Sequence, residues 1–298
     1  MLKLNNILSL FALSALTLTL LGSCRHREHV LCDPEYDTDH AGYLSAELMW
    51  DESDDILSPV DDVRLTISDG GNILKNKQFS TPLAVAEYVQ HLPSGNYDAF
   101  AAVNMSEARG YVLTTENTES TESKNTLPAT FVSLKDPQAK MSQSWFAVAN
   151  ATVTDGSLTV AQLSLKRLLA SLSVTIKGAP DGTTADITIL HTAQSVELTT
   201  ASASTAETAA PTAALPVEHL LLMPTAAEQP RTMLILNITT PGGNPQQCTL
   251  DAPRMDIGKI YNMELEYNDL DVYLYITSTP ITDWEEYWTI SGEVFNPD

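Results

Sequence analysis

The clearest strand pattern of the chain lies in residues 261–276, which read YNMELEYNDLDVYLYI. Every second residue from Tyr261 to Tyr267 is hydrophobic and the residues between them are polar, so one face of an extended strand would be buried and the other would face water. The alternation resumes in residues 272–276, and Asn268-Asp269 between the two segments has turn chemistry. The stretch therefore predicts a β-hairpin.

The same period of two recurs along the rest of the chain, and turn residues such as Asp69-Gly70-Gly71-Asn72 separate the segments. Short strands with frequent turns are typical of an all-β sandwich. Two segments fit less well: Thr81-Pro82 predicts a capped short helix over residues 83–89, and residues 163–172 fit either a helical turn or a strand. Strands are expected at Val63–Ile67, Tyr97–Val103, Trp145–Val153, Leu172–Ile176, Ile187–Ile189 and Met233–Ile238.

The N-terminal segment has the layout of a secretory signal, with a positive charge at Lys3, an almost uninterrupted apolar run over residues 7–21, and small residues after it. The run is shorter than the roughly 20 apolar residues that a transmembrane helix needs. Leu21-Gly22-Ser23-Cys24 resembles the bacterial lipobox, which implies cleavage before Cys24 and acylation of its sulfur. No later segment is long and apolar enough to cross a bilayer, so we expect lipid on Cys24 to provide the membrane attachment.

The net charge of -22 is spread over many acidic loops, and basic residues are scarce. Affinity for nucleic acid depends on Lys and Arg side chains that neutralise phosphates, so nucleic acid is not an expected partner. The same excess of acid disfavours electrostatic docking onto anionic lipid headgroups. Its main physical effect is to keep the protein soluble and self-repelling.

The hydrophobic pattern divides the chain into four parts. Residues 1–23 form the signal peptide, and residues 24–41 lack a hydrophobic period, as a flexible lipid tether would. Residues 42–164 and 165–298 are expected to form an N-terminal and a C-terminal β-sandwich domain, the second with a terminal strand. Two low-complexity stretches are expected to be exposed loops that add little core, residues 114–125 and 199–214.

The sequence has no readable catalytic, cofactor or metal site. His91, His191 and His219 stand beside no nucleophile motif, and no phosphate-binding glycine loop is present, so we do not expect an enzyme. The one cluster of metal-ligand types matches no closed zinc spacing and is better explained as solvated tether. Cys32 and Cys248 are free to pair in an oxidising compartment or to stay apart. The cluster of metal-ligand residue types comprises His26, His29, Cys32, Asp33 and His40.

Four motifs stand in order behind the lipobox: residues 92–97 (LPSGNY), 165–174 (LKRLLASLSV), 258–265 (GKIYNMEL) and 281–284 (ITDW). Together they resemble the fimbrillin superfamily of Bacteroidales type V pili, and most closely the fimbrial anchor lipoproteins at the base of those fibres. The resemblance covers nearly the whole chain. It implies two tandem transthyretin-like β-sandwich domains and a polymer of fimbrillin subunits that assembles by strand exchange at the cell surface.

In strand exchange, a partner's strand fills a groove whose backbone groups are unpaired and whose floor is apolar. The candidate strand-exchange segment here is the C-terminal one, over residues 287–295 and the tryptophan before it. The same segment is equally compatible with the last strand of its own sandwich. Its possible anchors are Trp284, Trp288, Ile290 and Phe295.

The resemblance also implies that stalk fimbrillins are cut after an arginine downstream of the lipid-bearing cysteine, which discards the first strand and opens the groove. Here Arg25 and Arg27 lie directly beside Cys24, and the next arginine, Arg64, falls inside an expected strand. A well-placed cleavage arginine is missing. If the first strand, around residues 43–50, is retained, the groove stays closed, as expected of an outer-membrane anchor and chain terminator.

An alternative from a different class is a lipid-anchored glycan-binding protein of a polysaccharide-uptake system, in which tryptophans would stack on sugar rings. Carbohydrate platforms need aromatic side chains that are exposed together, whereas the four tryptophans lie in or beside strand patterns, where a core position is expected. The tryptophan positions therefore favour a fimbrial protein, and the resemblance implies that it lies on the surface of the outer membrane. The tryptophans are Trp50, Trp145, Trp284 and Trp288.

Overall fold

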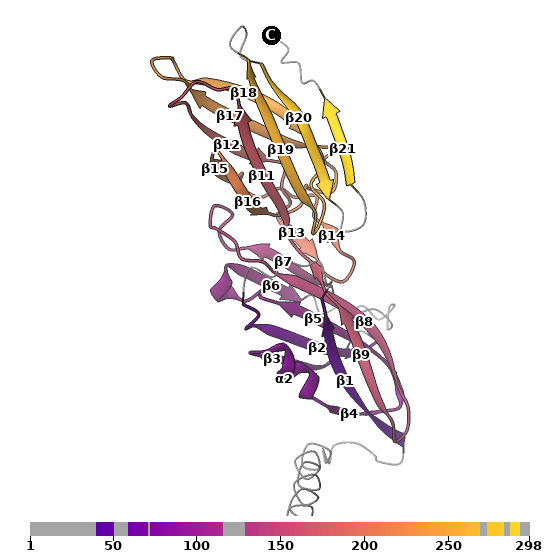
Figure 1. Cartoon of the computed structure of the whole chain (residues 1–298). Coiled ribbons are helices and arrows are strands. Elements are labelled where there is room, and N and C mark those ends of the chain that lie inside the picture. The colour runs from indigo at the N-terminus through magenta and orange to yellow at the C-terminus, as the bar shows by residue number, and fades with distance from the viewer. Residues whose placement is uncertain are drawn as a thin grey trace, which may run out of the picture.

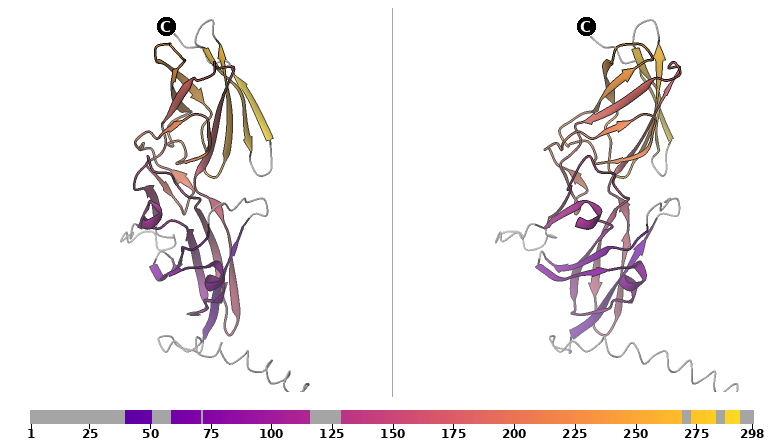
Figure 2. Two further views of the ribbon diagram at one scale, coloured as in Figure 1. Left: turned by 60° about the vertical axis from the view of Figure 1, so that its left-hand side comes forward. Right: turned by 90° about the vertical axis from the view of Figure 1, so that its left-hand side faces the viewer.

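The computed structural model describes residues 40–50, 59–70, 72–115, 129–268, 273–282 and 287–292. Within these ranges nearly all regular structure is β, in strands β1 to β21. The all-β prediction is confirmed. Figures 1 and 2 show the strands in two groups that lie end to end, with the start of β1 at the far end of one group and β19, β20 and β21 in the other.

The first group is a sandwich of two sheets, with strand orders β4-β1-β9 and β10-β8-β5-β2-β3. Alternate side chains point inward from both sheets and form one hydrophobic cluster. Its members come from positions between Leu44 and Leu165 in the sequence, and Trp145 among them is fully buried. Its strands are β1 (Ala41–Met49), β2 (Val63–Asp69), β3 (Asn72–Phe79), β4 (Gln90–Pro93), β5 (Gly95–Val103), β8 (Trp145–Val153), β9 (Leu158–Ser164) and β10 (Lys166–Arg167).

The second group pairs a sheet of order β16-β11-β19-β20-β21 with a sheet of order β15-β12-β17-β18. Its hydrophobic cluster runs from Ala170 to Leu265 and draws on both sheets. Its strands are β11 (Ala170–Lys177), β12 (Thr184–Leu190), β15 (Thr212–Ala214), β16 (Val217–Leu222), β17 (Thr232–Thr239), β18 (Gln246–Ala252), β19 (Ile260–Asn268), β20 (Tyr273–Thr282) and β21 (Tyr287–Gly292).

A fifth sheet, of order β14-β13-β7-β6, joins strands from both sides of the expected domain boundary. In it, Val196 of β13 lies opposite Val132 of β7. A third hydrophobic cluster lies beside it and includes Leu168 and Leu169 from the boundary itself. The division into two domains with transthyretin-like topology stays a prediction. The strands of this sheet are β6 (Tyr111–Thr115), β7 (Thr130–Leu134), β13 (Ser195–Glu197) and β14 (Ser202–Ala203).

The predicted C-terminal hairpin is confirmed, because β19 and β20 pair antiparallel with Leu265 opposite Ile276. Tyr261, Met263 and Leu265 are buried, as the alternation predicts. The strand β19 itself extends to Asn268, so only part of the expected turn remains, and that part lies outside the described residues. The predicted hairpin between β2 and β3 is also present, and Asp69 at the end of β2 lies opposite Asn72 at the start of β3.

The predicted short helix is α2 (Pro82–Glu87). The Thr81 hydroxyl caps its N-terminus by accepting a hydrogen bond of 3.1 Å from the Ala84 amide, and Val85 is its buried residue. Residues 163–172, by contrast, are strand rather than helical turn, since they contribute the end of β9, all of β10 and the start of β11. The described residues also include a short 3-10 helix, η2 (Glu107–Arg109).

The low-complexity stretch 199–214 is mostly exposed, as expected, but it is not simply a loop. It contains β14 and β15, and β15 adds an edge strand beside β12 with Ala213 opposite Ile187. Neighbouring strands supply the hydrogen bonds here, so a segment without a hydrophobic pattern becomes part of a sheet. Of the other expected loop, residues 114–125, the structure describes only the end of β6.

Candidate subunit-assembly site

The strand β1 is hydrogen-bonded on both of its sides. It pairs antiparallel with β4, where Tyr43 lies opposite His91, and parallel with β9, where Tyr43 lies opposite Leu158 and Met49 opposite Ser164. A strand between two neighbours presents no open edge to another chain. In the presence of β1 this sheet is therefore closed at its centre (Figure 1).

The inward face of β1 contributes to the core of the first group. Leu44 is 1% exposed and Ala46 is 3% exposed, and both belong to the hydrophobic cluster that contains Leu65 of β2, Leu92 of β4 and Leu163 of β9. Without β1, this apolar floor would be open and the facing edges of β4 and β9 would lose their main-chain partners. These are the two properties of a groove that accepts a strand.

The beginning of β1 is fixed by main-chain hydrogen bonds to two turns. The Ser94 amide donates to the His40 carbonyl at 2.8 Å, and the Gly156 amide donates to the Ala41 carbonyl at 2.9 Å. The Tyr43 amide in turn donates to the Ser157 carbonyl at 2.8 Å. The point where the expected tether enters the fold is thus held in place by the loop before β5 and the turn before β9.

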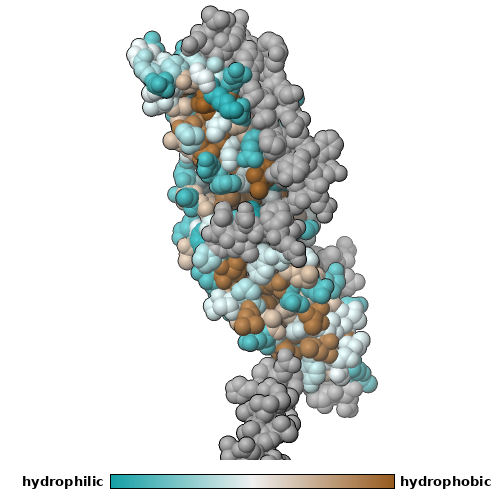
Figure 3. Space-filling view, in the orientation of Figure 1, coloured by the Kyte–Doolittle hydropathy of each residue, from teal (hydrophilic) through white to brown (hydrophobic). Residues whose placement is uncertain are grey.

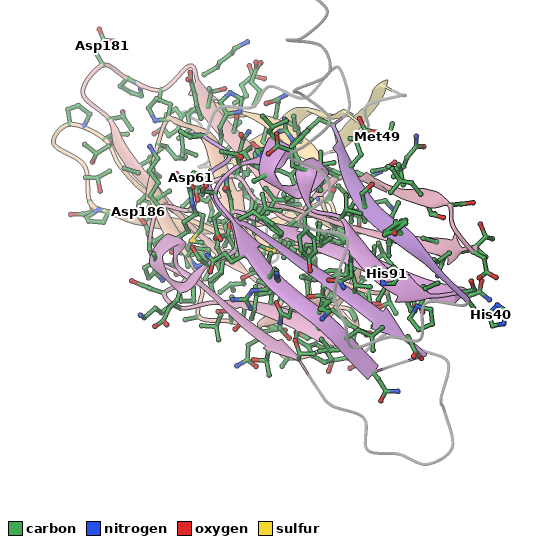
Figure 4. All side chains as sticks on the ribbon, turned by 90° about the horizontal axis from the view of Figure 1, so that it is seen from below. His40, Met49, Asp61, His91, Asp181 and Asp186 are labelled. Atoms are coloured by element: carbon green, nitrogen blue, oxygen red, sulfur yellow. The ribbon has the colours of Figure 1, made fainter. Side chains whose placement is uncertain are left out.

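A small polar cluster lies at the same point. The Ser94 hydroxyl donates to Asp155 Oδ1, and His40 Nδ1 lies 3.1 Å from Asp155 Oδ2. These hydrogen bonds, that of Ser94 first, hold the pKa of the Asp155 carboxyl below its usual range. His40 is at the tip of the ribbon of β1 and Met49 is at its opposite end (Figure 4). Because the cluster is exposed, its ionic part contributes little to stability.

Gly42 lets β1 approach the turn between β8 and β9 closely. A Cβ atom at this position would collide with the Thr154 carbonyl oxygen and would lie 2.8 Å from Val153 Cγ1. Any larger residue would have to push the start of the strand away from that turn. Glycine is therefore required by the packing of the first strand.

On the outer face of this sheet, the rings of Tyr43 and His91 pack with their centroids 5.1 Å apart. Leu158 and Val160 of β9 are about half exposed beside them, at 54% and 46%. On the face shown in Figure 3, hydrophobic side chains gather over this group of strands in several clusters separated by polar ones.

The C-terminal strand β21 lies at the edge of its sheet and pairs antiparallel with β20. Trp288 is opposite Ile281 and Ile290 is opposite Thr279 in this register. Two of the four candidate anchors thus belong to a strand that pairs within its own chain. The other two, Trp284 and Phe295, lie outside the described residues, as does Cys24.

The remaining candidate residues are scattered. His91 is buried on β4, His191 Nδ1 lies 3.0 Å from Glu207, and His219 is on the exposed part of β16. Cys248 is a free thiol in the core of the second group, and burial raises its pKa to about 11. Cys32 and the tether residues before His40 lie outside the described residues.

Two tryptophans bear on the glycan-binding alternative. Trp145 is fully buried in the first core, and Trp50 is half-buried and packs against the same cluster. Neither forms part of an exposed aromatic platform. In the described parts of the chain, no three His, Cys, Asp or Glu side chains gather closely enough to bind a metal ion. No helix among the described residues has the length and hydrophobicity to cross a membrane.

Sequence reasoning missed Asp155 and the parallel partner strand β9. Asp155 meets His40 across 115 positions of sequence, and no local pattern signals such a contact. Ser94 belongs to the motif of residues 92–97, but nothing in that motif indicates that its side chain binds Asp155. Two further motifs meet directly, because Ser171 of the second lies opposite Ile260 of the third.

The chain is similar to several solved structures. To the fimbrial anchor protein Mfa2 from Porphyromonas gingivalis it has 13% identity and a TM-score of 0.50, with 85% of this chain and 99% of that chain covered. To a fimbrial assembly protein from Parabacteroides distasonis it has 9% identity and a TM-score of 0.52, with 84% and 98% covered. To a protein from Bacteroides thetaiotaomicron that is described as a candidate polysaccharide-binding protein it has 14% identity and a TM-score of 0.53, with 84% of this chain and 98% of that chain covered. At such identities the likeness shows the fold alone.

The comparison of sequences is more specific. A comparison with curated proteins found no match. The profile of one family, however, matches residues 24–289 and so covers both groups of strands. The chain belongs to the family of fimbrillin-A associated anchor proteins Mfa1 and Mfa2.

Proposed function

We propose that this protein is the lipid-anchored subunit that ends a fimbrium at the outer membrane, and that it has no enzymatic role. The observation that carries the proposal is the position of β1, paired on both sides and packed into the core through Leu44 and Ala46. While β1 is present, no partner strand can enter the sheet between β4 and β9. Membership of a family of anchor proteins supports the same role.

The position of Arg64 supports the retention of β1. This arginine is the second residue of β2, where its neighbour Val63 is fully buried. Cleavage after Arg64 would remove β1 and also cut into the strand that pairs with β3 and β5. The tether arginines Arg25 and Arg27 precede β1, so cleavage there would leave the strand in place.

The partner contact that we propose uses the C-terminal segment. Among the described residues, β21 is an edge strand that pairs with β20 alone, so its release costs one strand pairing rather than two. In this proposal the segment leaves β20 and fills the open groove of the neighbouring fimbrillin subunit by strand addition, with Trp284, Trp288, Ile290 and Phe295 as anchors. The lipid on Cys24 then holds the assembled fibre at the outer membrane.

The first experiment is to solubilise outer membranes in mild detergent, capture the protein, and identify its N-terminus and its partners by mass spectrometry. We expect an acylated Cys24 at the N-terminus, all residues of β1, and co-purifying fimbrillin subunits. A mature chain that begins after β1 would instead indicate a stalk or tip subunit. An acylated chain that co-purifies only with nutrient-uptake receptors would refute the fimbrial role and favour glycan binding.

A second experiment supplies the missing cleavage site. Ser53→Arg places an arginine between β1 and β2, and Ser53→Lys is the matched control with the same charge but no arginine. Cleavage of the arginine variant by the arginine-specific protease of the assembly pathway should discard β1 and let a further subunit add. Fimbriae would then continue past the anchor and be released into the medium. Equal fibre length and retention in the two variants would contradict the role of β1 as a terminator.

A further inference from the structure

A shallow, open hollow lies between the first sandwich and the fifth sheet, and no residue of β1 lines it. One wall is the outer face of β2 and β3, and the other is the end of the hairpin formed by β6 and β7. The floor is Phe100 of β5, which is only 3% exposed. The lining residues are Arg64, Thr66, Ile73, Asn76, Phe100, Leu113, Thr115 and Thr130.

Two edge strands border this hollow. The strand β3 ends its sheet and pairs only with β2, and β6 ends the fifth sheet and pairs only with β7, within the described residues. Leu113 and Thr115 of β6 line the same hollow as Ile73 and Asn76 of β3. A strand added to this edge of β6 would extend the fifth sheet at the border of the hollow.

The polar lining favours an anion. Arg64 is half-buried, and no acidic partner is found for it among the described residues. The nearby carboxylate of Asp62, which precedes β2, instead accepts a hydrogen bond of 2.7 Å from Gln78. A guanidinium is matched to a carboxylate in charge and in shape, and a pair in a hollow of this kind is less screened than one on the open surface.

Hydroxyl groups complete the lining beside Arg64. Thr66 is 8% exposed, and the Thr115 and Thr130 hydroxyls lie 3.5 Å apart across the β6–β7 pair. The floor and side walls are apolar at Phe100, Ile73 and Leu113. The single aromatic ring is almost completely covered, so it offers no stacking platform for a sugar.

We propose that this hollow is a second strand-acceptor site, which binds an extended acidic segment of a partner protein. The segment pairs its main chain with the free edge of β6 and places one carboxylate side chain on Arg64. Its apolar neighbours on the same face cover Ile73 and Leu113. This site is separate from the groove closed by β1, so it does not depend on the terminator role proposed above.

The test uses the full mature protein in detergent and a fluorescein-labelled peptide of seven residues, in which valine and threonine alternate around one central glutamate. Binding is measured by fluorescence anisotropy, and hydrogen exchange reports on the amides of β6. We expect Arg64→Gln to weaken binding by about tenfold, as for the loss of one charged hydrogen-bonded pair. Arg231→Gln, which removes an exposed arginine from the second group, is the matched control and should bind as the unchanged protein does.

Changes in the peptide test the same proposal without altering the protein. Replacement of the central glutamate by glutamine should weaken binding by a similar factor, and N-methylation of alternate peptide amides should abolish it. Slower exchange of the β6 amides should accompany binding. The proposal is overturned if glutamate and glutamine peptides bind equally, if the N-methylated peptide still binds, or if free glucuronate displaces the peptide at an equal concentration.

Discussion

Replacing Leu44 with alanine tests whether β1 is a core strand of the folded protein. Leu44 is 1% exposed and packs in the cluster that joins both sheets of the first group. Truncation of such a leucine loses its transfer free energy and leaves a cavity, which together cost about 2 to 5 kcal/mol of unfolding free energy. With a urea dependence of about 2 to 3 kcal/mol per molar, the midpoint should fall by about 1 M or more.

Leu158→Ala is the matched control, because it makes the same chemical change on the neighbouring strand of the same sheet. Leu158 is 54% exposed on the outer face, so its truncation should cost less than about 1 kcal/mol. Urea unfolding is followed by tryptophan fluorescence, for which the fully buried Trp145 reports on the first core. Equal midpoints for the two variants would refute the reasoning, because β1 would then not be packed as a core strand.

Three further predictions concern single sites. Thr81→Ala removes the hydroxyl that caps α2 and should lower the free energy of unfolding by about 1 kcal/mol. Thr81→Ser keeps a hydroxyl and should retain most of that stability. An equal loss of stability in the two variants would exclude the cap. Because burial raises the pKa of Cys248 to about 11, iodoacetamide at pH 8 should alkylate it at least about tenfold more slowly in the native protein than in urea, as peptide mass spectrometry would measure. The Ser94 hydrogen bond lowers the pKa of Asp155, so the stability that this carboxylate adds is present above the ordinary Asp pKa of about 3.9 and is lost as the pH falls through the lowered pKa. Asp155→Asn should reduce that loss in acid unfolding curves, and an unchanged pH profile would count against the contact.

Much of the strand content was predictable because its signals are local. The expected strand Trp145–Val153 coincides with β8 at both ends, and the turn chemistry after Asp69 correctly predicted the hairpin of β2 and β3. Side-chain alternation and turn residues report on a few neighbouring positions, so they can be read without knowledge of the fold. The short strands β14 and β15 escaped prediction, because their Ala/Thr sequence has no alternation and their pairing comes from β13 and β12.

The candidate site was predictable only in part. The sequence predicted the first strand, the lack of a suitably placed cleavage arginine, and the C-terminal segment as a candidate for strand exchange. It did not reveal that β9 is the parallel partner of β1, nor that Asp155 fixes its start near His40. Such contacts join segments more than a hundred residues apart, and no pattern within either segment specifies the other.

The sequence by itself thus determined where most strands and turns form, that the chain is acidic, and that a lipobox-like stretch is followed by no suitably placed cleavage arginine. Only the tertiary structure decided that β1 is central rather than at an edge and that one sheet spans the expected boundary. It also decided that β6 and β3 end their sheets beside Arg64 within the described residues. The physical reason is that strand formation depends on local geometry, whereas strand partners are selected by the joint packing of side chains from distant segments into shared cores.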